Sequence, residues 1–341
     1  MAKTSLLVSL GEWTNRTLIL PVVVFFPTSR CNSRCVSCDW WQADGAGDLD
    51  PDEIDRLAGQ LPALGTRVVL FSGGEPLLRP EIFDLAPLFT RRGLALHLHT
   101  SGVLLERSAP RVATQFSKVI VSLDSADEDG YRSIRGVNAL RAVERGILKL
   151  RDLAPLLPMS ARATLHRRNF RELPRIVEHA RAMALDGVSF LAADVTSGAF
   201  GRAGHGPSPD LALDRDEIVE FADIVERTIV ERRDDFESGF IAESPARLRR
   251  LPQYYAALAG LAPFPDVRCN APYVSVVIEA DGQVRPCFFH RAVGSIRSQP
   301  LARIVEHNLV AFRESLSVGD DPVCERCVCS MRAGWRSAPW R

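Results

Sequence analysis

Three cysteines on one short segment have the spacing of metal ligands. In Cys31-Asn-Ser-Arg-Cys35-Val-Ser-Cys38, three and then two residues separate the thiols. Three thiolates on a tight loop can ligate three irons of a four-iron cluster and leave the fourth iron open, as a catalytic cluster requires. A zinc site is the alternative, but zinc ligands usually come as one close pair with a second pair further along the chain. The triplet therefore favours a [4Fe-4S] cluster.

A glycine-rich turn is the second segment that could bind a ligand. Ser72-Gly73-Gly74-Glu75-Pro76 directly follows an apolar run at 67–71. Two glycines let the backbone approach a ligand closely, because no side chain intervenes. The Glu75 carboxylate can accept a hydrogen bond from a ligand ammonium group. Taken alone, the segment could also be a purely structural turn.

A second group of cysteines lies near the end of the chain. Cys269 and Cys287 flank a predicted hairpin with its turn at Asp281-Gly282, and three more follow a predicted helix at 301–312: Cys324, Cys327 and Cys329. A hairpin brings its two bases together, and a Cys-x2-Cys turn supplies two more thiolates. Four thiolates would complete a cluster with no open iron. A structural zinc site remains the alternative on spacing alone.

Bulk properties limit where such a protein works. The chain has eight cysteines and no recognisable secretion signal at its start, which favours metal ligands over disulfides. The apolar run at 18–26 is too short to span a bilayer. A formal net charge of zero predicts no broad attraction to nucleic acid or to an anionic membrane. We therefore expect a cytoplasmic protein without nucleic-acid or membrane partners.

The pattern of the first half predicts the elements that position these segments. Short apolar runs occur at 18–26, 67–71, 94–99, 118–123, 160–165 and 187–192. Segments of helical spacing alternate with them, at 52–61, 81–92, 140–150 and 173–185. This alternation predicts βα units and a parallel sheet. Six units are too few for a complete eight-fold barrel, so we expect an α/β fold with a partial (βα)6-type TIM barrel.

Three regions follow from this division. Residues 1–193 would form the partial barrel, and residues 194–262 a loop followed by helices at 215–233 and 245–261. Residues 263–341 would form a small cysteine-rich appendage.

Within the barrel, His97 and His99 alternate along one strand and so share a face, where His99 could contact substrate. Asp194, after the sixth run, is a candidate general acid or base. The alternative for the two histidines is that they are core residues, and the alternative for Asp194 is that it caps a loop. His205, in the glycine-rich loop, could belong to a lid.

The cysteine triplet and the Gly-Gly-Glu-Pro turn together resemble the radical S-adenosylmethionine (SAM) superfamily, over residues 18–192. The resemblance implies that the open iron of the cluster chelates SAM, whose reductive cleavage yields a 5′-deoxyadenosyl radical. By the same resemblance Gly73, Gly74 and Glu75 would hold the methionyl ammonium group. Three further residues would make the remaining contacts, on the ribose side and to the carboxylate: Ser122, Asp124 and Arg162.

Two further features are judged against this family. Ser37 stands where the family usually has an aromatic residue near the adenine, and Trp40 or Trp41 could supply that surface instead. The tail resembles the SPASM or twitch appendage, which implies an auxiliary [4Fe-4S] cluster. Its ligands would be four of the five cysteines, Cys269, Cys287, Cys324 and Cys327. Cys329 is left as an alternative ligand or a free thiol.

The function predicted from these residues is oxidative modification by hydrogen-atom abstraction. The substrate would be a small metabolite or a peptide, and flavodoxin or ferredoxin would be the one-electron donor. Only about twenty residues precede the first predicted strand, too few for a separate peptide-binding domain, which favours a small molecule. Two alternatives remain: a redox-neutral radical SAM enzyme acting on a peptide, and a non-catalytic binding protein stapled by zinc.

Overall fold

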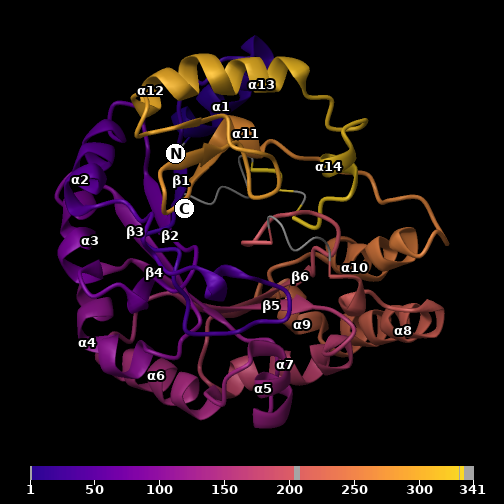
Figure 1. Cartoon of the computed structure of the whole chain (residues 1–341). Helices are drawn as coiled ribbons and strands as arrows, with labels where there is room; N and C mark the ends of the chain where they lie inside the picture. Colours follow the sequence, from indigo (N-terminus) through magenta and orange to yellow (C-terminus); the bar gives the residue numbers. More distant parts are fainter. Residues whose placement is uncertain (1, 203–207, 330, 334–341) are drawn as a thin grey trace.

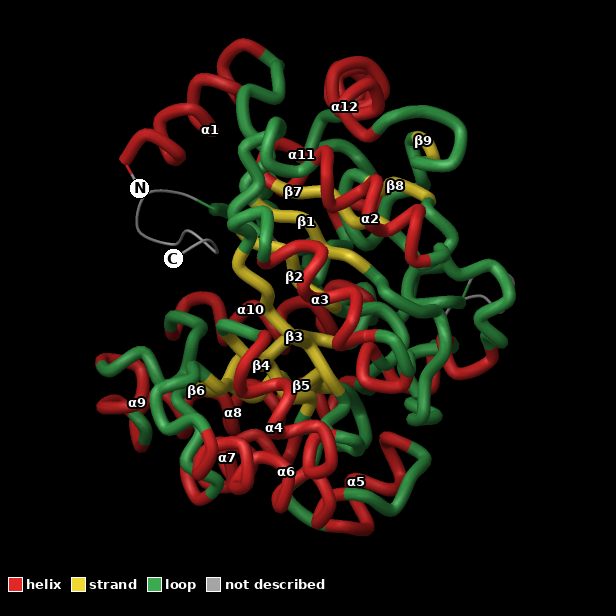
Figure 2. Tube along the Cα trace, turned by 90° about the vertical axis from the view of Figure 1, so that its left-hand side faces the viewer, coloured by secondary structure: helices red, strands yellow, loops and turns green. Residues whose placement is uncertain are grey.

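A single nine-stranded sheet organises the chain in the computed structural model, which describes residues 2–202, 208–329 and 331–333. Within these residues the strand order is β6-β5-β4-β3-β2-β1-β7-β8-β9 (Figure 2). The first six strands are parallel and follow the sequence order, as the partial (βα)6-type barrel requires. They are β1 (Val22–Phe25), β2 (Val68–Phe71), β3 (Ala95–Thr100), β4 (Lys118–Ser122), β5 (Met159–Leu165) and β6 (Gly187–Ala192).

Helices cover one face of this sheet (Figure 1). They are α2 (Pro51–Gln60), α3 (Ile82–Thr90), α4 (Leu105–Gln115), α5 (Glu128–Arg135), α6 (Leu140–Leu153) and α7 (Leu173–Ala182). On β3, Leu96 and Leu98 are buried in the core beneath them, whereas His97 and His99 lie on the opposite face. The helix-covered face is therefore apolar, and polar side chains occupy the inner face.

The six strands and the four helices predicted from periodicity are all present, which confirms the α/β barrel. Two barrel helices were not predicted, α4 and α5, and neither was the N-terminal helix α1 (Ala2–Thr14). Pro110 interrupts the pattern of α4, and α5 has only eight residues and two buried side chains. Both helices are amphipathic, but α5 is short and the buried face of α4 is made partly of the small side chains Ser108 and Ala109, so neither segment stands out as an apolar helical pattern in the sequence.

The helices after β6 close the side of the barrel next to that strand. They are α8 (Arg215–Glu231), α9 (Arg233–Glu237) and α10 (Pro245–Leu258). Tyr255 of α10 ties them to the sheet: its hydroxyl donates to the Leu165 carbonyl over 2.6 Å and accepts from the Ala193 amide over 3.1 Å. The ends of β5 and β6 are thus held by one fully buried side chain.

The cysteine-rich appendage continues the barrel sheet. Its predicted hairpin is present as β7 (Ser275–Ile278) and β8 (Gln283–Arg285), and a short β9 (Gly294–Ser295) follows. The pairing that sequence did not predict joins β7 to β1, parallel and in register, with Val22 opposite Ser275. The remaining helices are α11 (Ala271–Val274), α12 (Leu301–Arg303), a π-helix (Ile304–Asn308), α13 (Leu309–Ser315) and α14 (Pro322–Glu325). Among the described residues, no helix is long and apolar enough to cross a lipid bilayer.

Arg313 of α13 fastens the appendage to the N-terminal segment. Its guanidinium donates to the Asn15 side chain over 3.1 Å, to the Thr17 hydroxyl over 2.8 Å and to the Pro272 carbonyl over 3.0 Å. Arg313 is only 4% exposed, and its contact with the Pro272 carbonyl is buried, whereas Asn15 and Thr17 are partly buried. Removing the donor would leave buried polar groups without partners.

We therefore expect Arg313→Met, which keeps the apolar stem, to lower the free energy of unfolding by about 1–3 kcal/mol. Urea denaturation followed by circular dichroism measures this difference. Arg303→Met, at an exposed position of the same helical region, is the matched control and should change the value by no more than about 0.5 kcal/mol. Equal stability of the two variants would contradict the role given to Arg313.

Candidate metal centres

The three-cysteine loop follows β1 directly and is anchored by the end of α5. The amides of Arg34 and Val36 donate to the carbonyls of Arg135 and Ile134, over 2.8 and 3.0 Å. Helix α5 then ends at Gly136, whose φ of 67° favours glycine. A Cβ at this glycine would stand 2.7 Å from the Arg34 carbonyl oxygen, so the close approach also excludes a side chain.

The thiols of this loop are close together and partly buried. The pKa of Cys31 is raised to about 11 and that of Cys38 to about 12, mainly by burial, and the nearby Cys35 contributes to both shifts. Three such thiols would ionise together only beside a cation or a metal. The loop is therefore suited to metal ligation and poorly suited to holding free thiolates.

Arg135 supplies a fixed positive charge at the loop. Its Nη1 donates to Cys35 Sγ over 3.4 Å, and its Nε lies 2.6 Å from Asp124 Oδ2, with both side chains nearly buried. Burial alone would lower the pKa of Arg135, but Asp124 and Cys35 raise it above the usual value, so the guanidinium stays charged. Arg135 was not predicted as a site residue, because 100 residues separate it from Cys35.

The Gly-Gly-Glu-Pro turn packs directly on the start of the cysteine loop. The Gly74 amide donates to the Thr28 carbonyl over 3.2 Å, and the Glu75 amide donates to the Arg30 carbonyl over 2.8 Å. A Cβ at Gly74 would stand 2.1 Å from the Arg30 carbonyl oxygen, closer than two such atoms can approach. The close approach of the cysteine loop therefore requires glycine at position 74, whether or not a ligand also needs the space.

The Glu75 side chain turns into the protein. It is fully buried, with Oε1 accepting from the Thr100 hydroxyl over 2.7 Å and Oε2 accepting from the Ser101 amide over 2.6 Å. Burial raises the pKa of this carboxyl, while these donors oppose the rise. Glu75 thus joins the turn to the end of β3. Its contact with the ammonium group of SAM stays a prediction.

The donor set of the loop fits a cluster with one open corner. The loop carries three free thiols, and two of its buried polar atoms, Asn32 Nδ2 and Ser33 Oγ, have no hydrogen-bond partner within the residues that the structure describes. Two polar groups without protein partners beside the thiols are available to contact a bound group. A SAM-binding cluster held by Cys31, Cys35 and Cys38 is compatible with each of these features.

A row of polar side chains crosses the inner face of the barrel. Ser122 of β4, Arg162 of β5 and Ser189 of β6 are in register, and Arg162 Nε donates to Ser189 Oγ over 3.1 Å. His99 Nε2 lies 3.3 Å from Ser122 Oγ. Burial, then Arg162 and Arg135, lower the pKa of His99 to about 3, so the imidazole is neutral near pH 7. The SAM contacts assigned to Ser122 and Arg162 stay predictions.

Two carboxylates named from sequence are already engaged by the protein. Asp124 pairs with Arg135 and accepts from the Thr164 amide over 2.7 Å. Asp194 Oδ2 lies 2.7 Å from Arg202 Nη2, and both side chains are almost fully buried. Asp194 also accepts from the Thr196 amide over 3.1 Å, as a loop cap would. Proton transfer by Asp194 stays a prediction, and His205 lies outside the described residues.

Five aromatic residues, here termed the aromatic bridge, connect the cysteine loop to the appendage. They are Phe26, Trp40, Phe200, Phe288 and Phe289. Trp40 meets Phe26 edge to face at 5.7 Å between ring centroids, and Phe26 stacks on Phe288 at 6.3 Å. Trp41 is 38% exposed and lies beside Arg34. Of the two tryptophans near the position of Ser37, Trp40 is thus the one that faces inward.

Four thiols of the appendage converge into a second centre. Burial raises the pKa of Cys269, Cys287 and Cys324, to about 12 for Cys287, and the nearby Cys327 raises all three. Asp321 orients the Cys-x2-Cys turn by accepting from the Cys324 amide over 2.9 Å. These four thiols fit a cluster without an open corner.

Two more side chains approach the second centre. The Cys329 thiol lies near enough to Arg162 and Cys269 for both charges to affect its pKa, which burial raises. His290 was not predicted as a site residue, yet its Nε2 lies 3.3 Å from Cys324 Sγ. The only available sequence signal was its position three residues after Cys287. Nothing in the sequence brings it to Cys324.

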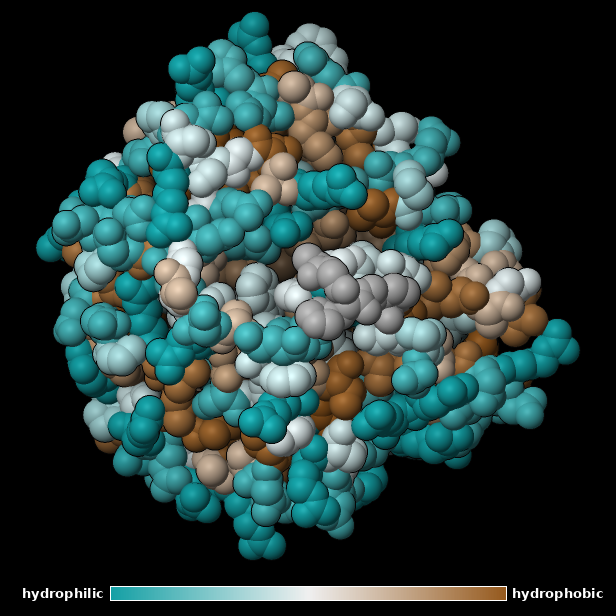
Figure 3. Space-filling model, in the orientation of Figure 1, coloured by the Kyte–Doolittle hydropathy of each residue, from teal (hydrophilic) through white to brown (hydrophobic). Residues whose placement is uncertain are grey.

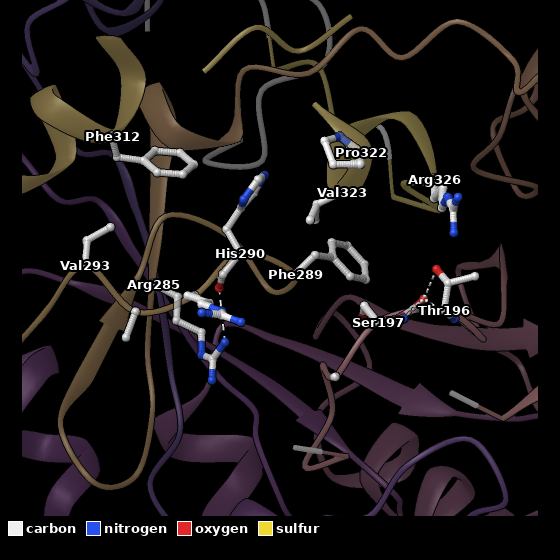
Figure 4. Close-up of a pocket in the computed structure, with 14 residues that line it drawn as sticks. Thr196, Ser197, Arg285, Phe289, His290, Val293, Phe312, Pro322, Val323 and Arg326 are labelled. Atoms are coloured by element: carbon white, nitrogen blue, oxygen red, sulfur yellow. Dashed lines mark hydrogen bonds between the residues drawn. The ribbon is translucent and has the colours of Figure 1, made fainter. Parts of the chain in front are cut away.

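A cavity of about 850 Å³ opens beside this second centre. The loop after β6 contributes Thr196 and Ser197, and the segment after β8 contributes Phe289 and His290, which project into the cavity (Figure 4). Tail residues, including Arg326, close the opposite wall. On the face shown in Figure 3 the surface is hollowed near its centre. The volume is in the range of small-molecule sites.

Comparison with known proteins agrees with this geometry. A family model described as the radical SAM superfamily matches residues 25–180, and the SPASM model, described as an iron–sulfur cluster-binding domain, matches residues 269–328. The cysteine loop and the Gly-Gly-Glu-Pro turn lie within the first match. Four of the five appendage cysteines, Cys269, Cys287, Cys324 and Cys327, lie within the second.

Individual curated relatives match about half of this chain. Fe-coproporphyrin III synthase of Methanosarcina barkeri is 33% identical over 46% of this chain and 40% of its own length. PqqA peptide cyclase of Rhodopseudomonas palustris is 31% identical over 50% of this chain and 46% of its own length. The chain thus spans about half the length of the curated relatives it matches.

Solved structures match over nearly the whole chain. Streptococcus suis SuiB bound to S-adenosylmethionine has a TM-score of 0.68 at 14% identity, covering 96% of this chain and 76% of that protein. Native anSMEcpe with bound AdoMet has a TM-score of 0.65 at 18% identity, covering 91% of this chain and 87% of that protein. At these identities the likeness establishes the fold.

We expect Arg135→Met to weaken iron retention at the three-cysteine loop by about ten- to a hundredfold, because Cys35 loses its donor. Asp124 would also be left as an unpaired buried charge. Iron and sulfide analysis after anaerobic reconstitution measures the effect. Arg132→Met, on the same helix but in an exposed pair with Asp129, is the control and should retain full iron. Full iron in the Arg135 variant would refute the assignment.

Proposed function

Because this chain belongs to the radical SAM superfamily and carries a SPASM domain, we propose that it cleaves S-adenosylmethionine reductively and oxidises its substrate after hydrogen-atom abstraction. The observation that carries the oxidative part is the convergence of Cys269, Cys287, Cys324 and Cys327 in the appendage. When bound, the first cluster would supply the electron that cleaves SAM, and the auxiliary cluster would accept the electron that the substrate radical gives up. The electrons thus balance without a further oxidant in the site.

The residues of the chain prepare both centres for these roles. Arg135 compensates the charge of the thiolates on the first loop, since its guanidinium touches Cys35 and remains ionised. The aromatic bridge lines the space between the cysteine loop and the appendage with apolar rings, of which Phe26 is buried. In this proposal a bound substrate completes that apolar lining, and the radical forms there away from water.

We place the substrate between the inner face of the barrel and the cavity beside the appendage. His99 is neutral near pH 7, so in this proposal it contacts the substrate as a hydrogen-bonding group. When the substrate radical gives up its electron, it also loses a proton. In this proposal Asp194 is the candidate to accept that proton, and its ion pair with Arg202 would have to open during turnover.

The proposal covers a small molecule or a peptide. A cavity of about 850 Å³ can hold a compact metabolite or one side chain of a peptide with its neighbours. Relatives of both kinds support this range, since one is named for a peptide and another for a porphyrin. We further propose flavodoxin or ferredoxin as the electron donor. The required donor is a one-electron carrier, because SAM cleavage consumes one electron.

Three variants test the proposal. Cys35→Ala should abolish formation of 5′-deoxyadenosine with dithionite, because the first cluster loses a ligand. Cys287→Ala should lower iron from about eight to about four per chain and still form 5′-deoxyadenosine. Cys329→Ala is the matched control in the same tail and should keep both properties. Mass spectrometry of 5′-deoxyadenosine, together with iron analysis, provides the measurements.

Other results would lead to different conclusions. Wild-type protein that is colourless and holds zinc would make the chain a zinc-stapled binding protein. Once a substrate is found, formation of much less than one 5′-deoxyadenosine per product, without net oxidation of the substrate, would indicate redox-neutral chemistry instead. Unchanged 5′-deoxyadenosine formation in Cys35→Ala would refute the assignment of the first centre.

A further inference from the structure

His290 lies at the boundary between the cavity and the second thiol centre. Its side chain is 10% exposed, and its Nε2 is 3.3 Å from Cys324 Sγ. The edge of the imidazole meets the ring of Phe312, with the centroids 4.9 Å apart (Figure 4). The ring is therefore held in one orientation by a packing contact on one side and by the thiol on the other.

The backbone around His290 is held as firmly as its ring. The His290 carbonyl accepts from Arg285 Nη1 over 3.0 Å, and Arg285 Nε pairs with Glu279 Oε1 over 2.8 Å. Both partners belong to the β7–β8 hairpin that carries Cys287. The position of His290 is thus built into the hairpin.

The contact between His290 and Cys324 has the character of a hydrogen bond. A separation of 3.3 Å is what a nitrogen donor and a sulfur acceptor require, whereas ligands of different irons in one cluster must stand further apart. Four cysteines are already available for the cluster without the imidazole. Asp321 Oδ1 lies 3.6 Å from His290 Nε2, outside hydrogen-bond range. A proton on Nε2 would therefore have Cys324 Sγ as its hydrogen-bond acceptor.

We propose that His290 is a positioning residue that donates from Nε2 to the Cys324 thiolate and raises the reduction potential of the auxiliary cluster. This inference rests on the proposed function, because it needs a cluster at the four appendage thiols. A donor to a ligand thiolate draws electron density from the sulfur, which favours the reduced and more negative form of the cluster. A higher potential makes the cluster a better acceptor for the electron of a substrate radical.

Two substitutions separate this role from packing. His290→Phe fills nearly the same volume and keeps the contact with Phe312 but has no donor. His290→Gln has an amide NH2 at a similar reach and keeps a donor. Both are made in the full chain together with Cys35→Ala, so that the auxiliary cluster dominates the signal. The readouts are iron content and the midpoint potential from electron paramagnetic resonance of samples poised at fixed potentials.

We expect all three proteins to hold about four irons. The Phe variant should disfavour reduction about tenfold, which for a one-electron couple is a shift of about 59 mV to lower potential. The Gln variant should stay within about twofold of the parent.

An unchanged potential in the Phe variant at full iron content would overturn the inference. Loss of the cluster in both variants would also overturn the inference, because His290 would then be needed to hold the cluster. A nitrogen bonded directly to iron, detected by pulsed electron paramagnetic resonance in the parent, would overturn it by making His290 a ligand. Absence of any auxiliary cluster in the parent would instead refute the proposed function itself. The two failures are therefore distinguishable.

Discussion

The pairing of β1 on both of its edges is the constraint on which the two centres depend. β1 pairs with β2 on one side and with β7 on the other, and all three strands are parallel. Because the carboxyl ends of parallel strands meet at one edge of a sheet, the cysteine loop after β1 lies against the glycine turn after β2. The hairpin that β7 begins then brings Phe288 onto Phe26, at the end of β1. A one-residue slip would turn these side chains to the opposite face.

Buried charges hold the segments that the strands deliver. Asp124 pairs with Arg135 behind the cysteine loop, and Asp194 pairs with Arg202 in the loop after β6. Buried ion pairs contribute little net stability, because taking both charges out of water is costly. Their use here is positional, since each pair fixes a loop that has no regular structure. Arg135 has an additional role because the same guanidinium reaches a thiol.

The two thiol centres share one design. In each, a side-chain nitrogen from a different part of the chain lies within hydrogen-bond distance of one sulfur: Arg135 approaches Cys35, and His290 approaches Cys324. Charge on a ligand sulfur is sensitive to such donors, which tune a bound metal without contacting it. The two nitrogen groups differ in type. The charged guanidinium of Arg135 lies at the centre with three thiols, and the imidazole of His290 lies at the centre with four.

The sequence by itself determined the local features. Cysteine spacing identified the ligands proposed for both centres, and period-two and helical patterns located the six barrel strands and four of their helices, because ligand spacing and amphipathic period are properties of contiguous residues. Only the tertiary structure decided that β7 extends the barrel sheet, that Glu75 faces β3, and that Asp124 and Asp194 are paired with arginines. It alone brought Arg135 and His290 to their sulfurs. These contacts join residues far apart in the chain, and the arginines and histidine involved look the same in sequence as those on the surface, so only the packing of the strands reveals them.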